Sequence, residues 1–299
     1  MSHDVCDARH IVKRATICLL VDMARIISLL IVFGLWMSAN AAHAQSDPDE
    51  KALHFAATEG LAIYALDQAA WHGTDAFLEV MDDVNDAEWA GWVVSEDPDN
   101  EERLRVSFID GAVEPPASAV DVFIQNSEVR DLRINAPRRA LDASERIRRA
   151  GVQAMIAYVR DPGLDICRDF LPMNHVVLPK SDNPADGYRG YLFAATKQPG
   201  VIVLGRHFTF DLDANGVVTR EPTVSTKSCF AIPYGDDADD GVEDDSVVAA
   251  VAATHVTSNH PEPFHVFASL THRVPVVVGV SKTDELYEVA GSDIRRISP

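Results

Sequence analysis

Short apolar runs in which polar residues alternate, separated by clusters of turn-forming residues, recur along most of this chain and restrict it to a sheet-rich fold. Two such runs flank the turn Asp97-Pro98-Asp99-Asn100, and further runs begin at Val120 and Val129. Pro, Asp and Asn favour turns, whereas β-branched and aromatic residues favour strands. This part of the sequence therefore predicts a small antiparallel meander, with a loop at Pro115-Pro116.

Two segments instead repeat apolar residues at helical spacing. The first follows Asp47, which can cap a helix whose first position is Pro48, and it is expected to run to about Trp71. The second follows Asp142, where Glu145 completes a capping box, and Pro162-Gly163 is expected to end it.

Four arginines of the second helical segment form a basic cluster in an acidic chain. A solvated helix face that pairs with nearby carboxylates is one interpretation, and an anion-binding site is the other. They are Arg146, Arg148, Arg149 and Arg160.

Strand patterns resume after Cys167, and two acidic segments among them raise the question of calcium. Residues 211–216 match the opening of an EF-hand loop, but Pro222 stands where that loop needs a bidentate glutamate. Asn215-Gly216 favours a type I′ hairpin turn instead. Residues 235–246 carry seven carboxylates and predict a surface loop, with Ca²⁺ binding as the alternative.

The C-terminal part is expected to continue as strands. Residues 246–258 predict a buried strand or a short helix that ends near His255. Residues 264–273 alternate between apolar and polar, which predicts a second strand. Runs that begin at Val274 and Asp284 predict a final strand pair, with a short third strand after them.

Four histidines between residues 255 and 272 are the candidate chemical site, and they raise the question of a metal or catalytic centre. Zinc sites on helices use histidines four residues apart, but Pro261 and Pro263 argue against a helix through this segment. The metal-binding candidates are His255, His260 and His265, with Glu262 or a distant aspartate as a further ligand. Histidines that only hydrogen-bond within the fold are the competing interpretation, so we expect no cofactor, with Zn²⁺ or Ca²⁺ as the alternatives.

An export signal is predicted near the N-terminus. An apolar run from Ile26 to Met37 is shorter than a membrane-spanning helix, so a permanent anchor is the weaker interpretation. The run is followed by small residues, with Ala42 and Ala44 at the positions of a cleavage site. We expect a signal peptide over residues 1–44, with Met23 as the true start, and no membrane anchor after cleavage. The mature protein is then periplasmic or secreted.

Export also determines the expected state of the cysteines. Cys6 and Cys18 leave with the signal peptide, and Cys167 and Cys229 remain. In an oxidising compartment this remaining pair predicts one disulfide, with two buried thiols as the alternative.

The formal net charge of −20 disfavours nucleic acid and anionic lipid as partners. The sequence contains no nucleophile elbow, phosphate-binding loop, dinucleotide-binding fingerprint or zinc-protease motif. These observations favour a non-catalytic envelope or secreted protein that binds another protein or a small ligand. The alternative is a metal-dependent or other hydrolase that uses His255, His260 and His265.

The fold class predicted from these patterns is α+β: two mostly antiparallel sheets, each with a packed helix. After the signal peptide, residues 45–137 should form a helix and a meander, and residues 138–299 a helix and a larger antiparallel sheet.

Overall fold

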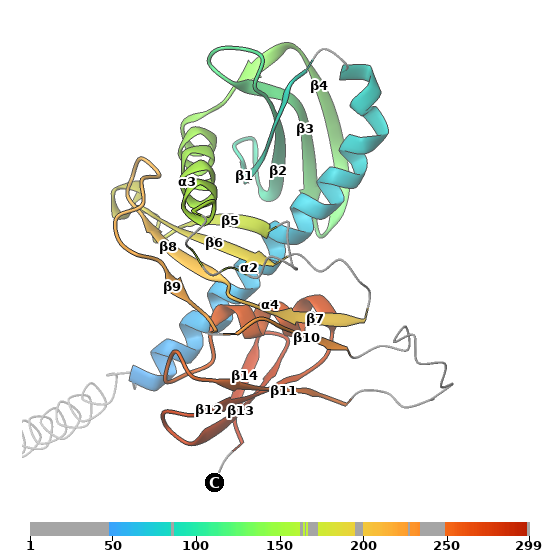
Figure 1. Cartoon of the computed structure of the whole chain (residues 1–299). Helices are drawn as coiled ribbons and strands as arrows, with labels where there is room; N and C mark the ends of the chain where they lie inside the picture. The colour runs from blue at the N-terminus through green and yellow to red at the C-terminus, as the bar shows by residue number, and fades with distance from the viewer. Residues whose placement is uncertain are drawn as a thin grey trace, which may run out of the picture. The chain divides into compact units, whose positions relative to one another are not determined.

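The computed structural model describes residues 48–84, 87–161, 164, 166, 173–194, 200–226, 228–233 and 249–297 (Figure 1). The predicted signal peptide, the acidic segment 235–246 and Cys167 lie outside these ranges. The chain divides into two compact units, Met1–Lys51 and Ala52–Pro299, and all of the described strands belong to the second. The division of the mature chain into residues 45–137 and 138–299 stays a prediction.

The first helix, α2 (Pro48–Val80), begins where the sequence predicts but continues nine residues beyond Trp71. Its buried face repeats every three or four residues, and Ala69, Gly73 and Phe77 carry this face past the expected end. A short 3₁₀ turn, η1 (Met81–Val84), follows.

The predicted meander is confirmed as a four-stranded antiparallel sheet in the order β1 (Trp89–Asp97), β2 (Asn100–Asp110), β3 (Ala117–Gln125), β4 (Glu128–Ala140). The C-terminal half of α2 packs on it, where Phe77 stacks on Phe108 with ring centroids 4.1 Å apart. Asn126 and Ser127 both have positive φ, as a tight turn between β3 and β4 requires.

The second helix, α3 (Ala143–Val159), starts with the predicted capping box. The Glu145 amide donates to the Asp142 carboxylate (2.9 Å), and the Asp142 amide donates to the Glu145 carboxylate (2.7 Å). Its C-cap is Arg160, two residues before the predicted stop at Pro162-Gly163, which lies outside the described residues. Local hydrogen bonds suffice to set the start of this helix, which explains why the sequence predicts it correctly.

A buried network of charged groups joins the start of α3 to the sheet β1–β4. Arg139 donates to Asp121 (2.6 Å) and to Glu145 (2.7 Å), and the Ser107 hydroxyl lies within hydrogen-bond distance of both carboxylates. Asp121 and Glu145 are buried. Because buried charges are costly unless paired, this network requires α3 to sit on this face of the sheet.

A second antiparallel sheet has the order β5 (Met173–Pro179), β6 (Tyr188–Ala194), β8 (Phe208–Leu212), β9 (Thr223–Val224), with a 3₁₀ turn η3 (Pro184–Asp186) between β5 and β6. It packs on α3 through an apolar core that includes Met155 and Leu212. The strands β7 (Val201–Leu204) and β10 (Phe230–Pro233) form a separate antiparallel pair.

The chain reverses after β8 near Asn215-Gly216, as expected, but the predicted type I′ turn is wrong. Of these two residues only Gly216 has a positive φ, of 79°. The Asp213 amide donates to the Val217 carbonyl (2.9 Å), so the reversal is wider than two residues. The Asp213 carboxylate accepts from the amides of Asn215 and Val217 and so stabilises the wider turn.

The last sheet has the order β11 (Val251–His255), β12 (Val276–Val280), β13 (Glu285–Ala290), β14 (Asp293–Arg296). The strand predicted over residues 264–273 is wrong, because α4 (Pro263–His272) is a helix. Strands β11 and β12 pair in parallel, and a parallel pair needs a crossover connection, which α4 supplies. Pro263 occupies its first turn, where the missing N–H costs nothing.

The α+β class is therefore confirmed, while the expected number of sheets is not. The described strands form four sheets rather than two, and three α-helices pack on them. The helix α2 contacts both ends of this arrangement: its Gly60 lies against Val266 of α4, and its Gly73 lies against Val106 of β2.

Candidate functional site

The structure places the predicted histidines on a strand end, a loop and a helix. His255 ends β11, His260 lies in the loop that follows, and His265 lies in the first turn of α4. The rings of His255 and His265 meet at right angles with centroids 5.0 Å apart. This cluster therefore forms at the carboxyl end of a parallel strand and the N-terminus of a helix, a common place for ligand sites in α/β units.

His255 is the centre of the cluster, and only 1% of its surface is exposed. Its Nε2 lies 2.7 Å from the Ser258 hydroxyl, 3.1 Å from the Thr257 hydroxyl and 3.3 Å from a Glu262 carboxylate oxygen. The Nδ1 atom is buried and has no hydrogen-bond partner among the described residues. These polar partners of His255 thus converge on one nitrogen.

This geometry differs from that of a catalytic triad. In a triad the nucleophile contacts one imidazole nitrogen and a carboxylate orients the ring through the other. Here Ser258 and Glu262 share Nε2. The Ser258 hydroxyl also donates to the His260 carbonyl (2.5 Å), and the Thr257 hydroxyl donates to the Ser225 carbonyl (2.7 Å). The network fastens the loop 256–262 to the end of β11.

His265 serves the helix rather than the loop. Its Nδ1 accepts the backbone N–H of Glu262 at 2.9 Å, which satisfies an amide at the N-terminus of α4. Burial, and then the nearby His255, lowers the pKa of His265 to about 3. His265 is therefore neutral at physiological pH.

Metal binding by His255, His260 and His265 stays a prediction. In the ranges that the structure describes, no three His, Cys, Asp or Glu side chains are arranged to hold a metal ion. His260 joins the cluster through its backbone, whose N–H and carbonyl both contact the Ser258 hydroxyl. The carboxylate of Asp211, in the segment that resembles a calcium loop, is paired with Lys180 at 2.8 Å. The predicted Cys167–Cys229 disulfide remains a prediction, because Cys167 is outside the described residues.

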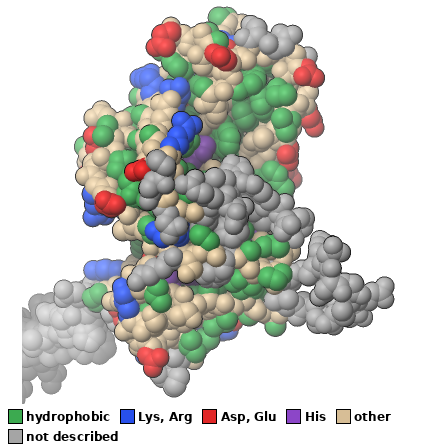
Figure 2. Space-filling model, viewed as in Figure 1, with side chains coloured by type: hydrophobic (Ala, Val, Ile, Leu, Met, Phe, Trp, Pro, Cys, Tyr) green, Lys and Arg blue, Asp and Glu red, His purple; other side chains and the backbone are tan. Residues whose placement is uncertain are grey.

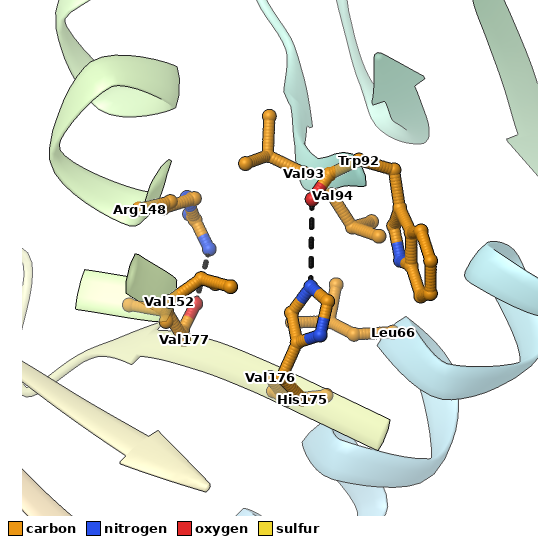
Figure 3. A pocket seen from close by; sticks show the side chains of 9 residues that line it. All are labelled: Leu66, Trp92, Val93, Val94, Arg148, Val152, His175, Val176 and Val177. Carbon is orange, nitrogen blue, oxygen red and sulfur yellow. Dashed lines mark hydrogen bonds between the residues drawn. The ribbon is translucent and has the colours of Figure 1, made fainter. Parts of the chain in front are cut away.

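A shallow pocket with a cavity volume of only about 10 Å³ lies between α2, β1, α3 and β5 (Figure 3). The register of β1 shifts just before Trp92, and the Trp92 ring lies 4.8 Å from the His175 ring. His175 Nε2 lies 3.4 Å from the Trp92 carbonyl, and burial lowers the pKa of His175 to about 4. Of the residues that line this pocket, only Arg148 is among the candidates predicted from the sequence.

The cation that lines this pocket is already engaged. Arg148 donates to the Val177 carbonyl (2.6 Å) and to the Glu96 carboxylate (2.5 Å), as Figure 3 shows for the carbonyl. Only 2% of Arg148 is exposed, so the interpretation of its helix face as solvated is wrong for this arginine. Arg148 and His175 therefore connect β1, α3 and β5 through hydrogen bonds within the protein, and the remaining lining of the pocket is mostly apolar.

Large apolar side chains of α2 are exposed between the residues that it buries. The exposed fractions are 48% for Leu61, 58% for Trp71 and 55% for Leu78, and Tyr64 is partly buried between them. We call these four residues the outer stripe. These residues are three, seven and seven positions apart, a spacing that places them along one side of a helix. The sequence did not reveal the stripe, because the helix was expected to end at about Trp71, before Leu78.

Comparisons of the chain with known protein families, with curated proteins and with solved structures find no match. No α-helix in the described part of the chain has both the length and the apolar character that crossing a membrane requires.

Proposed function

We propose that this chain is a non-catalytic binding protein of the cell envelope or the extracellular space, and that it docks another protein on the outer stripe of α2. The observation that carries this proposal is the exposure of Trp71 and Leu78 on a helix whose buried residues are already packed. Tryptophan is the residue most enriched at the energetic centre of protein interfaces. Exposed apolar residues that follow one another along an element mark interaction surfaces more often than scattered ones do.

The geometry of the histidine cluster supports a structural role for it. Ser258, Thr257 and Glu262 approach the same nitrogen of His255, and the two hydroxyl groups also donate to carbonyls. A hydrolase needs a nucleophile that can reach a substrate and a base oriented from behind. In this protein the same groups instead hydrogen-bond to one another and hold the loop 256–262 against the end of β11.

Incorporation of a photo-crosslinking amino acid at position 71 tests this function in the native host. Irradiation should give one discrete adduct, and a second substitution, Leu78→Asp, should remove it. The same probe at Leu286, an exposed residue of β13, is the control. If position 286 gives the same adducts as position 71, the outer stripe is not a docking surface.

A hydrolase is the second candidate function, and one distance favours it. Ser258 Oγ lies 2.7 Å from His255 Nε2, within the range of a nucleophile and its base. A fluorophosphonate probe, which labels activated serines, should modify the purified protein if it is a serine hydrolase. Labelling that disappears in Ser258→Ala and in His255→Ala would replace the binding function with catalysis.

A further inference from the structure

We propose that the partner that occupies the outer stripe presents a positively charged amphipathic helix, which lies along α2. This inference rests on the proposed function, because it names the chemistry of the partner for the same surface. Three properties of the stripe support it: its period, its length and the charges beside it.

The period of the stripe fits a second helix. Leu61, Tyr64, Trp71 and Leu78 occupy heptad positions that repeat on one side of a helix. Side chains at this spacing form the knobs that enter the holes of a facing helix. Residues 61–78 extend for roughly 26 Å at 1.5 Å per residue, which is enough for about two and a half heptads of a partner.

The charges on α2 disfavour the binding of a second copy of this chain to the outer stripe. Between residues 52 and 80 the helix contains no Lys or Arg. Its acidic residues include Asp75, at a heptad position within the stripe, and Glu79, one turn further on, and both are exposed. Figure 2 shows hydrophobic side chains gathered on the upper part of the face in view, with acidic side chains along its outer edge.

Two copies facing one another would bring like charges together, which destabilises a complex. The net charge of −20 adds to this repulsion at long range, and it also disfavours an anionic membrane surface. A partner helix that carries Lys or Arg beside its apolar residues would instead meet Asp75 and Glu79 with opposite charge. Charge complementarity therefore selects a cationic partner.

Two synthetic 21-residue helical peptides provide the test, and both carry Leu at the heptad core positions. One has Lys at all other positions, and the other has Glu. Calorimetric titration of the purified protein should show binding of the Lys peptide and none of the Glu peptide. Trp71→Ala should weaken binding of the Lys peptide at least tenfold.

A matched pair of double variants separates local docking from general attraction. Asp75→Asn with Glu79→Gln should weaken binding of the Lys peptide about fivefold and reduce its dependence on salt. Glu101→Gln with Asp182→Asn removes the same charge from exposed positions away from α2 and should leave the affinity unchanged. Circular dichroism of every variant confirms that it is folded.

The outcomes distinguish the inference from the proposed function. Equal weakening by both double variants, or no effect of Trp71→Ala, means non-specific attraction and overturns the cationic helix. Equal binding of the Glu peptide that still depends on Trp71 also overturns it, while the docking surface stands. Absence of binding by both peptides overturns it as well, and the photo-crosslink at position 71 then decides the proposed function separately.

Discussion

At the scale of single residues, Asp121 contributes to stability through its buried partners. Burial alone would raise the pKa of Asp121, but hydrogen bonds from Arg139 and Asn135 outweigh it and lower the pKa to about 2. The ordinary value is 3.8. A carboxyl whose pKa is lowered by folding stabilises the protein above pH 3.8, and this contribution is lost as the pH falls towards 2.

Asp121→Asn should therefore destabilise the protein by about 3 kcal/mol at pH 7, because it leaves the Arg139 charge short of a partner. About 2 kcal/mol of this loss should disappear between pH 4 and pH 2. Urea unfolding at several pH values measures both quantities. Asp131→Asn, which removes an exposed ion pair with Arg133, is the control and should cost less than about 1 kcal/mol. A loss that does not change with pH would contradict the ionic role of Asp121.

Asp67 of α2 should behave in the opposite sense. Burial raises the pKa of Asp67 to about 6, although hydrogen bonds from Asn174 and Gln68 lower it. A carboxyl whose pKa is raised by folding costs nothing below pH 3.8 and destabilises the protein increasingly as the pH rises to about 6.

Asp67→Asn keeps an acceptor for the Asn174 amide, which donates to Asp67 at 2.8 Å in the native protein. We expect the variant to be more stable than the native protein by about 1–2 kcal/mol at pH 7 and equal to it at about pH 3.5. Thermal unfolding at the two pH values checks this. If the variant is instead less stable than the native protein at pH 7, the ionised Asp67 carboxylate does not destabilise the folded state, and this prediction is wrong.

At the scale of elements, glycine determines how closely α2 approaches α4. A Cβ atom on Gly60 would lie 2.5 Å from the Val266 Cβ and 2.6 Å from the Pro263 carbonyl oxygen. The second of these atoms belongs to the backbone and cannot rotate away. The absence of a side chain at Gly60 therefore allows the two helices to pack.

Gly60→Ala should destabilise the protein by about 1–3 kcal/mol, because the cost of overpacking exceeds the gain in helix propensity. Gly279→Ala on β12 is the control, since a Cβ there would make only ordinary contact with Leu286, at 3.4 Å. Denaturant unfolding of both variants provides the comparison. If Gly60→Ala is as stable as the native protein, the packing of α2 on α4 is looser than described.

The helix α4 shows, at the same scale, why a strand pattern over residues 264–273 is misleading. The apolar residues of this segment fit alternation, and a proline argues against a helix interior, although it is favoured at the first helical position that Pro263 occupies. The strands β11 and β12, which lie on both sides of this segment in the sequence, pair in parallel. A parallel pair needs a crossover connection, and a helix over this segment provides it. No pattern within the segment itself contains that information.

At the scale of the whole molecule, the predicted export determines where a partner could be met. The protein from its native host should begin at Gln45, with residues 1–44 removed, and should fractionate outside the cytoplasm. Ala42→Leu with Ala44→Leu should block cleavage and leave a longer, membrane-associated precursor. Intact-mass spectrometry of both forms gives the answer, and a cytosolic protein with an intact N-terminus would rule out the envelope function.

The sequence by itself determined the α+β class, the meander β1–β4 and the start of α3, because alternation, turn residues and a capping box act over a few neighbouring residues. Only the tertiary structure decided that His255 and His265 meet, that Arg148 is buried and that Trp71 and Leu78 remain exposed. Each of these depends on which distant elements cover a side chain, and local spacing does not specify that covering.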